Sequence, residues 1–578
     1  MDKKSYCIAW LMLLFVGSLH AQYRTTTYCN PLNLDYTYPF HNSHLGKSYR
    51  SGADPAVVEF RGEYYMFVTR SWGYWHSKDL LNWDFITPEK WYFEGCNAPA
   101  AHNYKDSVLY VCGNSSGAMS ILYTDNPKRG DWKAVPSVLH DLQDPALFID
   151  DDERAYMYWG ASNRWPIRGK ELDMKNKFLP IAKKPDSLLF LRPDIHGWER
   201  FGENHTSDIK PFIEGAWMTK HNGKYYLQYA APGTQFNVYG DGVYVGKSPL
   251  GPFEYAAHNP FCYKPGGFAT GAGHGSTVCG PGGIYWHFGT IHLSINYKFE
   301  RRLCMFPTFF DEDGAMYSDT YFGDYPHYSP DQVSRQTTSG GFRGWMLLSY
   351  GKPVKASSQL ESYPVENVTD ENLKTFWVAE KNDDKQWVEI DLEEVSDVYA
   401  LQLNFFDYEE TGFWGRMPNL RQRYLVEASV DGARWRVLVD YRNSFRDAPH
   451  NYIELDQPIE ARYIRYRHHY VPGKNLAMGD IRVFGLGRGK KPATVKGFTV
   501  VREADERNAR ISWKAVKGAQ GYNVLWGVAL DKLYSSWMVY GDNSLDLRAL
   551  TVGQKYYFAI EAFNENGISQ RVFLREAH

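Results

Sequence analysis

The chain has 578 residues, of which 23% are charged, and its formal net charge is −3. A chain of this length exceeds a single hydrophobic core, so we expect several domains. The near-neutral charge, without a long basic block or a basic stripe interleaved with aromatic residues, argues against a nucleic-acid partner.

Residues 1–21 are predicted to be a secretory signal peptide. Lys3 and Lys4 precede an apolar stretch from Cys7 to Val16, and the segment ends in the small residue Ala21, which is the order found in such signals. The apolar stretch is too short to span a membrane, and no other segment is predicted to do so. We therefore expect a periplasmic or secreted protein without a membrane span.

A pattern repeats five times between residues 54 and 290. In each repeat a turn-forming leader residue is followed ten to twelve positions later by an aromatic-rich strand. The leaders are Asp54, Ala98, Asp144, Glu214 and His274. Each repeat has room for about four strands, which is typical of a propeller blade of roughly 40 to 50 residues with loop insertions. The sequence therefore predicts an all-β chain that begins with a five-bladed β-propeller over residues 22–338.

Three of the five leaders are carboxylic acids. Equivalent positions on the innermost strands of successive blades face the central channel, so we expect Asp54, Asp144 and Glu214 to converge there. Like charges in a partly dry channel repel each other, and one carboxyl group then stays protonated while another stays ionised. An aspartate before proline is also a common turn opener. Its repetition at matched offsets favours the alternative interpretation, acid/base cleavage of a glycosidic bond.

Five short motifs resemble glycoside hydrolase family 43, a group of five-bladed propeller enzymes that act on plant and microbial polysaccharides. The resemblance covers residues 30 to about 325. Its motifs are Ser51–Pro55, Ser77–Trp83, Asp144–Phe148, Pro211–Trp217 and Gly271–Ser276.

The resemblance implies a role for each acid. Asp54 would be the general base, Asp144 would tune and orient the acid, and Glu214 would be the general acid. Members of the family invert the anomeric configuration, which needs base and acid carboxyl groups about 6.5 to 9.5 Å apart. Arg301 is similar to an arginine that contacts the substrate near the acid in this family, although Glu300 stands where the family has glycine.

The resemblance also bears on metal binding. In the family, the residue equivalent to His274 lies on the propeller axis and often helps to hold a metal ion through water. The six cysteines after residue 21 show no metal-binding spacing. We therefore expect no required cofactor or metal, and treat a structural calcium near His274 or in the next domain as optional.

Several other side chains are candidates for sugar contact. Aromatic rings stack on sugar faces, but they also fill the cores of sheets. The candidates are Trp72, Trp75 and Trp217, just beyond catalytic-strand positions, and Phe236 and Asn237, in an insertion after the blade of the acid.

A second module is predicted over residues 339–487. The runs Glu366–Asn372, Gln386–Leu392 and Met478–Gly485 resemble the discoidin or family 32 carbohydrate-binding jelly roll. Its loop Tyr408–Gly415 is the candidate for sugar contact, although such domains also act as spacers.

A basic linker, Gly487–Pro492, precedes a third module over residues 493–578. Its alternating strands resemble a fibronectin type III domain, an immunoglobulin-like β-sandwich. Trp513 would be its core tryptophan and Tyr557 its corner tyrosine, and we expect no catalysis from it.

The favoured interpretation is a monomeric, exo-acting, inverting glycosidase that removes a terminal sugar from plant-type polysaccharide side chains. The resemblance suggests α-L-arabinofuranose first, with β-xylosidase and galactose- or galactofuranose-releasing activities as alternatives. The alternative of another class is a propeller that binds glycans without cleaving them. That protein would not be expected to keep the three acids, because a buried carboxyl group without a task is costly.

Overall fold

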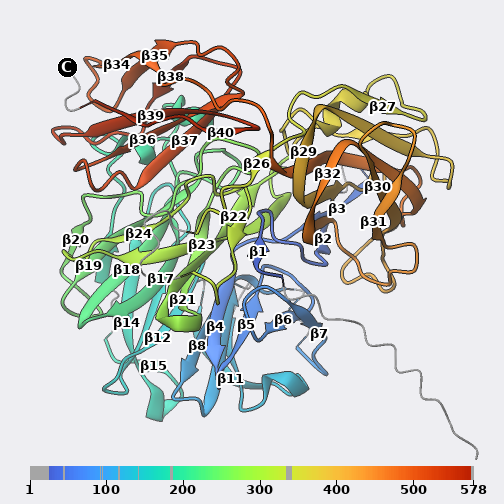
Figure 1. Ribbon diagram of the computed structural model, residues 1–578. Coiled ribbons are helices and arrows are strands. Elements are labelled where there is room, and N and C mark those ends of the chain that lie inside the picture. Colours follow the sequence, from blue (N-terminus) through green and yellow to red (C-terminus); the bar gives the residue numbers. More distant parts are fainter. Residues whose placement is uncertain are drawn as a thin grey trace, which may run out of the picture.

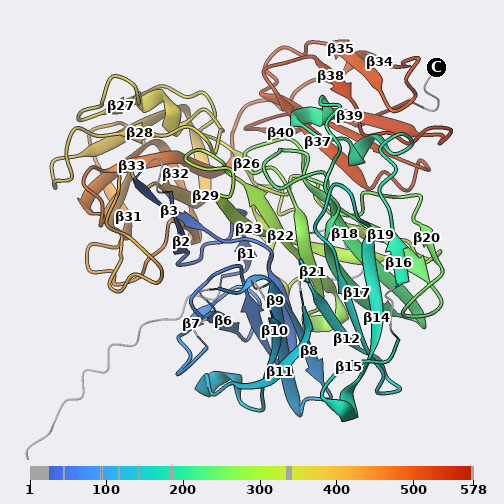
Figure 2. The same cartoon turned by 180° about the vertical axis from the view of Figure 1, so that it is seen from behind.

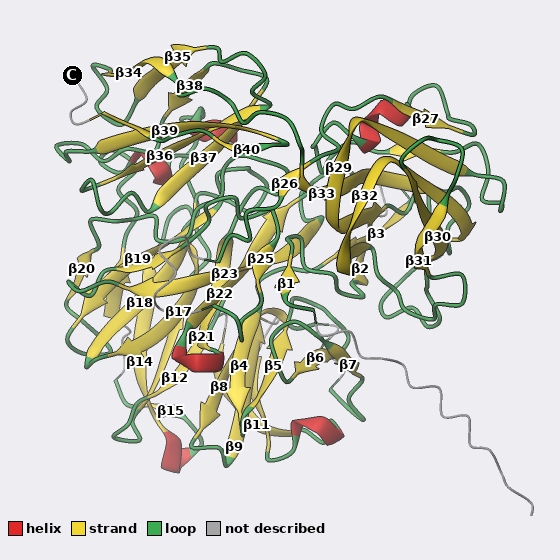
Figure 3. Ribbon diagram, in the orientation of Figure 1, coloured by secondary structure: helices red, strands yellow, loops and turns green. Residues whose placement is uncertain are grey.

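The computed structural model describes residues 25–42, 46–91, 93, 95–114, 118–140, 142–182, 186–333 and 341–574. The predicted signal peptide and the predicted domain limit between residues 338 and 339 lie outside these residues. The all-β prediction is confirmed for the described chain, in which helix is limited to short 3₁₀ segments (Figure 3). These are η1 (Pro127–Arg129), η2 (Met174–Asn176), η3 (Gly197–Glu199), η4 (Glu203–His205), η5 (Pro281–Gly283) and η6 (Val365–Val368). Across those same ranges, we find no helix with the length and apolar character needed to cross a membrane.

The first domain contains five antiparallel sheets that follow one another along the chain. We call it the five-sheet domain. Sheet one has β4 (Ala56–Phe60), β5 (Glu63–Phe67), β6 (Tyr74–Ser77) and β7 (Asp84–Ile86), and sheet two has β8 (Asn97–Tyr104), β9 (Val108–Asn114), β10 (Ala118–Thr124) and β11 (Lys133–His140). Sheet three has β12 (Ala146–Ile149), β13 (Ala155–Trp159), β14 (Ile167–Asp173), β15 (Leu179–Pro180) and β16 (Asp186–Leu189). Sheet four has β17 (Glu214–His221), β18 (Lys224–Ala231), β19 (Gly240–Gly246) and β20 (Phe253–Tyr255), and sheet five has β21 (Gly273–Cys279), β22 (Tyr285–His292), β23 (Arg301–Phe310) and β24 (Met316–Ser318).

The first strands of the five sheets form a ring. β4 contacts β8, β8 contacts β12, β12 contacts β17, β17 contacts β21, and β21 contacts β4. Buried side chains fill the space between neighbouring sheets, as where Trp75 of sheet one and Trp286 of sheet five share one hydrophobic cluster. A tight hairpin turn joins β17 to β18. Its two residues, Asn222 and Gly223, both have positive φ, as a two-residue type I′ turn requires. The residues that open the first strands meet at one end of the ring, since Nδ1 of His274, in β21, lies 3.4 Å from Asp54, before β4, and 3.6 Å from Asp144, before β12.

Two short sheets flank this domain. β1 (Thr27–Tyr28) pairs with β25 (His327–Tyr328), and β2 (Thr37–Asn42) pairs with β3 (Lys47–Ser51). The hairpin of β2 and β3 leads directly into the first leader residue, Asp54.

The second domain is one eight-stranded sheet system around a hydrophobic core. Its strands are β26 (Met346–Leu347), β27 (Val354–Ala356), β28 (Trp377–Val378), β29 (Trp387–Phe405), β30 (Arg423–Ser429), β31 (Arg436–Asp440), β32 (His450–Tyr470) and β33 (Ala477–Leu486). Pairing is antiparallel throughout, and register shifts divide the long strand β29, between Asp391 and Ser396 and again at Val398.

The C-terminal domain has two facing sheets. One contains β34 (Lys496–Arg502), β35 (Ala509–Lys514) and β38 (Ser544–Leu547), and the other contains β36 (Gly521–Gly527), β37 (Ser535–Tyr540), β39 (Tyr557–Asn564), β40 (Gly567–Ile568) and β41 (Val572–Leu574). Trp513 is buried in its core, as expected. The backbone contact expected of a corner tyrosine is made by Tyr556, whose hydroxyl accepts the N–H of Thr551 at 3.2 Å. The expectation for Tyr557 is wrong by one residue, because alternation along β39 leaves that side chain half-buried.

The two later domains both lie against the five-sheet domain, next to each other on one edge of it (Figures 1 and 2). Stacked rings of Tyr317 and Tyr534, with centroids 3.7 Å apart, join the C-terminal domain to sheet five. At the eight-stranded domain, Arg50 is 2% exposed and pairs with both Asp407 (2.9 Å) and Asp447 (2.5 Å). Charged residues that would be solvated in separate domains are thus buried between them.

A buried ion pair lies where all three domains meet. Arg482 of β33 is fully buried and pairs with Glu371 at 2.7 Å. The same guanidinium donates to the carbonyl oxygen of Asp324 in the five-sheet domain at 2.6 Å, and the hydroxyl of Tyr540 in the C-terminal domain donates to Glu371 at 3.3 Å.

Candidate active site

The leader residues lie together at the end of the ring where the first strands begin. Four of them, Asp54, Ala98, Asp144 and His274, have positive φ values between 43° and 56°. Such values are uncommon for residues other than glycine and are found where surrounding structure enforces them. In sheet four the residue with positive φ is Gly215, so Glu214 stands one residue earlier than the other leaders.

Asp54 is held as an ionised carboxylate. The hydroxyl of Thr69 donates to its Oδ2 at 2.5 Å, and the guanidinium of Arg301 lies 3.3 Å from its Oδ1. Burial opposes ionisation, but the charges of Arg301 and His274 and the bond from Thr69 outweigh it, so the pKa of Asp54 lies below its usual value. A carboxylate that keeps its charge while buried can accept a proton.

Asp144 and Glu214 show the opposite behaviour. Burial and the neighbouring carboxylates raise the pKa of Asp144 to about 7, although His274 works against the shift. Burial also raises the pKa of Glu214, against the lowering effects of His274 and of the Tyr239 hydroxyl, which donates to Glu214 at 2.5 Å. These two carboxyl groups hold protons under conditions in which Asp54 does not.

His274 lies among the three acids. Its Nδ1 is 3.4 Å from Asp54 and 3.6 Å from Asp144. Burial disfavours the imidazolium, but the surrounding carboxylates outweigh burial and raise the pKa of His274. Its backbone N–H donates to the fully buried Asp241 at 2.7 Å. Gly215 leaves room for the ring, because a Cβ at that position would lie 2.8 Å from Cγ of His274.

The described side chains near His274 do not form a set of ligands for the optional calcium ion. Within the described ranges, no group of three or more His, Cys, Asp and Glu side chains is arranged to hold a metal ion. The Nδ1 atom of His274 faces carboxylate oxygens, so an ion at this residue would depend on water for its other ligands. Calcium stays a prediction, and no step below depends on it.

Arg301 lies where the sequence predicts, beside the acids. It is the first residue of β23 and 6% exposed. Besides Asp54, its guanidinium reaches the hydroxyl of Thr234 at 3.3 Å, in the loop between β18 and β19.

One of the predicted sugar contacts, Trp75, is corrected. Trp75 is 1% exposed, packs in a hydrophobic cluster with Val57, and donates its indole N–H to Asp35 at 2.6 Å. Successive residues of β6 face opposite sides of the sheet, and this one faces the core. Asn237 is half-buried, and its amide donates to Asn204 at 2.8 Å and to the carbonyl of Pro265 at 2.9 Å. Its contact with a sugar stays a prediction.

The other three candidates are half-buried, and their role stays a prediction. Trp217 donates its indole N–H to the carbonyl of Thr277 at 3.3 Å, across the ring of first strands. Phe236 packs edge-on against Phe201, with centroids 4.6 Å apart, in the loop that also carries Thr234. Trp72 follows β5 and packs against the eight-stranded domain.

Sequence reasoning missed three polar residues of this site: Thr69, Tyr239 and Asp241. Thr69 could have been found from the hairpin, since pairing of Ala56 with Phe67 returns the end of β5 to Asp54. Tyr239 immediately precedes β19, the third strand of sheet four, and Asp241 is the second residue of that strand. No repeat in the sequence marks these positions.

Comparisons with known proteins agree with this geometry. Residues 49–316 match the family described as Glycosyl hydrolases family 43, and residues 353–478 match the F5/8 type C domain. An arabinoxylan arabinofuranohydrolase of Bacillus subtilis is 25% identical over 331 residues, which is 46% of this chain and 60% of that protein. A beta-xylosidase of Xylanibacter ruminicola is 33% identical over 133 residues, 19% of this chain and 39% of that protein.

A beta-D-galactofuranosidase of Aspergillus niger is 25% identical over 303 residues, 46% of this chain and 81% of that protein. The chain spans less than two thirds of the first two relatives, at 60% and 39% of their lengths. The matches are therefore matches of parts of the chain: residues 49–316 are similar to the family described as Glycosyl hydrolases family 43, and residues 353–478 are similar to the F5/8 type C domain.

Proposed function

We propose that this protein is an inverting, exo-acting glycoside hydrolase that removes a terminal sugar, α-L-arabinofuranose first among the alternatives, from polysaccharide side chains. The observation that carries the proposal is the contrast between two carboxyl groups at one end of the ring. The pKa of Asp54 is lowered while that of Glu214 is raised. Two titratable groups whose environments separate their pKa values in this way are suited to act as base and acid.

In the proposed reaction, Asp54 accepts a proton from a water molecule as the water oxygen bonds to the anomeric carbon. At the same time Glu214 donates its proton to the glycosidic oxygen, whose bond to that carbon breaks. Water enters opposite the leaving group, so the configuration inverts. Arg301 keeps Asp54 ionised, and the negative charge of Asp54 favours the protonated form of Glu214. Asp144 adds to this effect when it is ionised.

We also propose a fold for two of the domains, a location for the protein and its oligomeric state. The five sheets and their ring of first strands support a five-bladed β-propeller with the acids on its axis. The two-sheet C-terminal domain, with buried Trp513 and the corner tyrosine Tyr556, supports a fibronectin type III domain. We further propose that the protein is secreted or periplasmic and acts as a monomer.

Two alternative sugars are each favoured by one relative. The Xylanibacter ruminicola protein is named a beta-xylosidase and the Aspergillus niger protein a beta-D-galactofuranosidase. A glycan-binding protein without activity is the alternative of another class. It is disfavoured because Asp54, Asp144 and Glu214 are all present and interact with one histidine, His274.

The test compares wild type, Glu214→Gln and the matched control Glu254→Gln, an exposed glutamate on β20. Substrates are aryl glycosides of α-L-arabinofuranose, β-D-xylose and β-D-galactofuranose, together with arabinogalactan, and proton NMR follows the anomer of the product. We expect wild type and the control to release one sugar with inverted configuration. Loss of the general acid should slow hydrolysis of the polysaccharide by roughly 100-fold or more, and of the aryl glycoside by less, because a phenol leaves with little help.

Release of a product with retained configuration would refute the inverting mechanism. If wild type hydrolyses none of these substrates, the glycan-binding alternative gains over the enzyme.

A further inference from the structure

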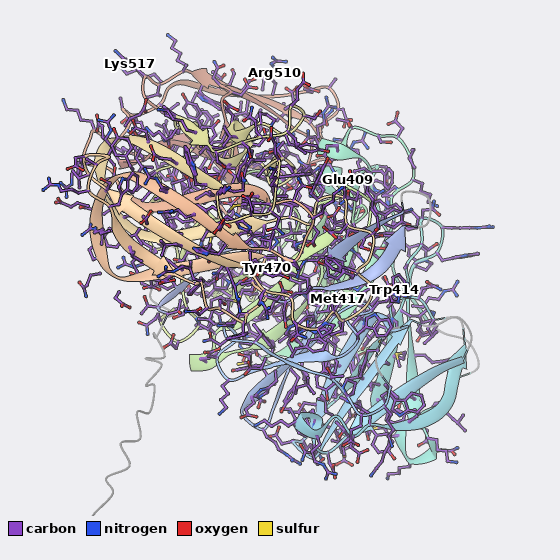
Figure 4. The ribbon with its side chains drawn as sticks, turned by 90° about the vertical axis from the view of Figure 1, so that its right-hand side faces the viewer. Glu409, Trp414, Met417, Tyr470, Arg510 and Lys517 are labelled. Atoms are coloured by element: carbon purple, nitrogen blue, oxygen red, sulfur yellow. The ribbon has the colours of Figure 1, made fainter. Side chains whose placement is uncertain are left out.

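A loop of the F5/8 type C domain, residues 408–417, is fastened to the five-sheet domain just before Asp54. Gly415 pairs with Tyr38 through both backbone groups, at 2.9 and 2.8 Å. The N–H of Phe413 donates to the hydroxyl of Ser48 at 3.1 Å. Figure 4 shows the labelled residues Glu409, Trp414 and Met417 along the boundary between the two domains. The loop is therefore held in one position relative to the strand that leads into the proposed base.

The same loop touches Trp72. A Cβ at Gly415 would lie 2.8 Å from Cε2 of the Trp72 indole, and Gly415 has a φ of +65°. Only glycine meets both conditions without displacement of its neighbour. Trp72 itself has a φ of +63°. This backbone conformation is rare for bulky residues, and the other domain covers one side of the indole. The Trp72 side chain is therefore fixed in its position.

Trp72 is close to the proposed base. It stands three residues after Thr69, whose hydroxyl is 2.5 Å from Asp54, and three residues of chain reach at most about 11 Å. The indole Nε1 of Trp72 is shielded from solvent and has no hydrogen-bond partner among the described residues. A buried donor without a partner is costly unless a ligand or water accepts from it.

Trp414 stands next to Gly415, and its side chain is 46% exposed. Large aromatic side chains exposed at the edge of a site supply rigid apolar area together with a polar N–H, which suits a sugar ring. Trp414 is therefore attached to the residue that packs on Trp72, which ties an exposed indole of one domain to a half-buried indole of the other.

We propose that the F5/8 type C domain is part of the substrate site of this protein. Gly415 fixes Trp72 beside the catalytic acids, and Trp414 contacts the polysaccharide chain beyond the sugar that is released. The inference rests on the proposed function and extends it from a terminal sugar to a polymeric substrate recognised by two domains.

The test uses the full chain with Trp414→Ala, Gly415→Ala and the control Gly412→Ala. Gly412 lies in the same loop, and a Cβ there would meet nothing within 4 Å. For each protein, kcat and KM are measured with whichever aryl glycoside wild type hydrolyses, and with arabinoxylan and arabinogalactan. Thermal unfolding midpoints are recorded alongside.

We expect Trp414→Ala to lower kcat/KM for the polysaccharide relative to that for the aryl glycoside by about tenfold, mainly through KM. Gly415→Ala should lower kcat/KM for both substrates, because the added Cβ displaces Trp72. Gly412→Ala should match wild type in both.

The inference is overturned if wild type is active and Trp414→Ala keeps the wild-type ratio of polysaccharide to aryl glycoside activity, or if Gly415→Ala keeps the wild-type kcat/KM for both substrates. It is also overturned if Gly412→Ala produces the same losses, since any disturbance of the loop would then suffice. Wild type that hydrolyses no substrate would instead refute the proposed function, and the inference with it.

Discussion

Removal of the Tyr239 hydroxyl is expected to move one limb of the pH–rate profile and leave the other in place. That hydroxyl donates to Glu214 at 2.5 Å, and Tyr239 is fully buried. The bond favours the carboxylate form of Glu214, so it lowers a pKa that burial raises. In Tyr239→Phe burial acts unopposed by this bond, and the pKa of Glu214 should rise further.

The size of the shift follows from the strength of the bond. A hydrogen bond to a charged group contributes about 1.5 to 3 kcal/mol, and one pKa unit corresponds to about 1.4 kcal/mol. Part of that contribution remains in the neutral acid, which also accepts hydrogen bonds. We therefore expect the alkaline limb of kcat/KM to move upward by about one pH unit. The plateau should fall, because a weaker acid assists the leaving group less.

The assay is kcat/KM against pH for a substrate that wild type hydrolyses. The alkaline limb reports the protonated carboxyl groups, and because Asp144 and Glu214 interact, its midpoint belongs to the pair. The acid limb reports Asp54, whose bonds to Thr69 and Arg301 are unchanged. It should stay where it is.

Tyr229→Phe is the matched control. Tyr229 is another fully buried tyrosine that donates to a fully buried glutamate, Glu199, at 2.6 Å, and neither residue contacts the three acids. Both limbs should keep their wild-type midpoints. An alkaline limb that stays fixed or moves downward in Tyr239→Phe, or an acid limb that moves instead, would refute the assignment of Glu214 as the acid.

Two other substitutions test packing, one behind the site and one where the domains meet. Gly215→Ala should abolish most activity, because its Cβ would lie 2.8 Å from the His274 ring. The control Gly223→Ala has a similarly positive φ of +74° but open space around it, so it should lose stability only. Equal activity losses in both variants would implicate backbone strain rather than His274. Arg482→Met leaves Glu371 buried without its partner, which costs about 3 to 5 kcal/mol of folding free energy. The thermal unfolding midpoint should therefore fall by several degrees. The double variant Arg482→Met with Glu371→Leu should recover part of the loss. No recovery in the double variant would show that packing, not charge, governs this junction.

The acids could be predicted from the sequence because their positions follow from a local rule. Each leader precedes a hairpin, and hairpin register is fixed by the turn and the alternation of buried residues. Equivalent leaders of repeated hairpins then meet at one end of the ring. The positive φ at Asp54, Asp144 and His274 could not be predicted, because it depends on the neighbouring sheet that enforces it.

The error at Trp75 has a similar cause. Trp72 and Trp75 both follow β5, and sequence alone does not say which of them faces the core. Gly73, just before β6, influences which side chains of that strand face the core. Its φ of 157° lies in a region that is populated mainly by glycine. The bend at that residue sends Trp75 inward and leaves Trp72 at the domain boundary.

The packing of the later domains against the five-sheet domain could not be predicted from the sequence, because several of its contacts are made by charged residues. Arg50 and Arg482 would be read as surface residues in separate domains. In the assembled chain both are buried and paired with carboxylates. Long-range charge pairing of this kind leaves no periodic signal in the sequence.

The charges of the site explain why its acids separate into one base, Asp54, and a pair, Asp144 and Glu214, that keeps a proton. Three carboxyl groups face two basic side chains, Arg301 and His274. Arg301 lies beside Asp54, which ionises, while His274 is shared among the three acids. One imidazolium cannot compensate both Asp144 and Glu214 in a buried site, so a proton remains on that pair. Of the two, Glu214 is partly exposed, and it is therefore the one that can deliver the proton to a substrate.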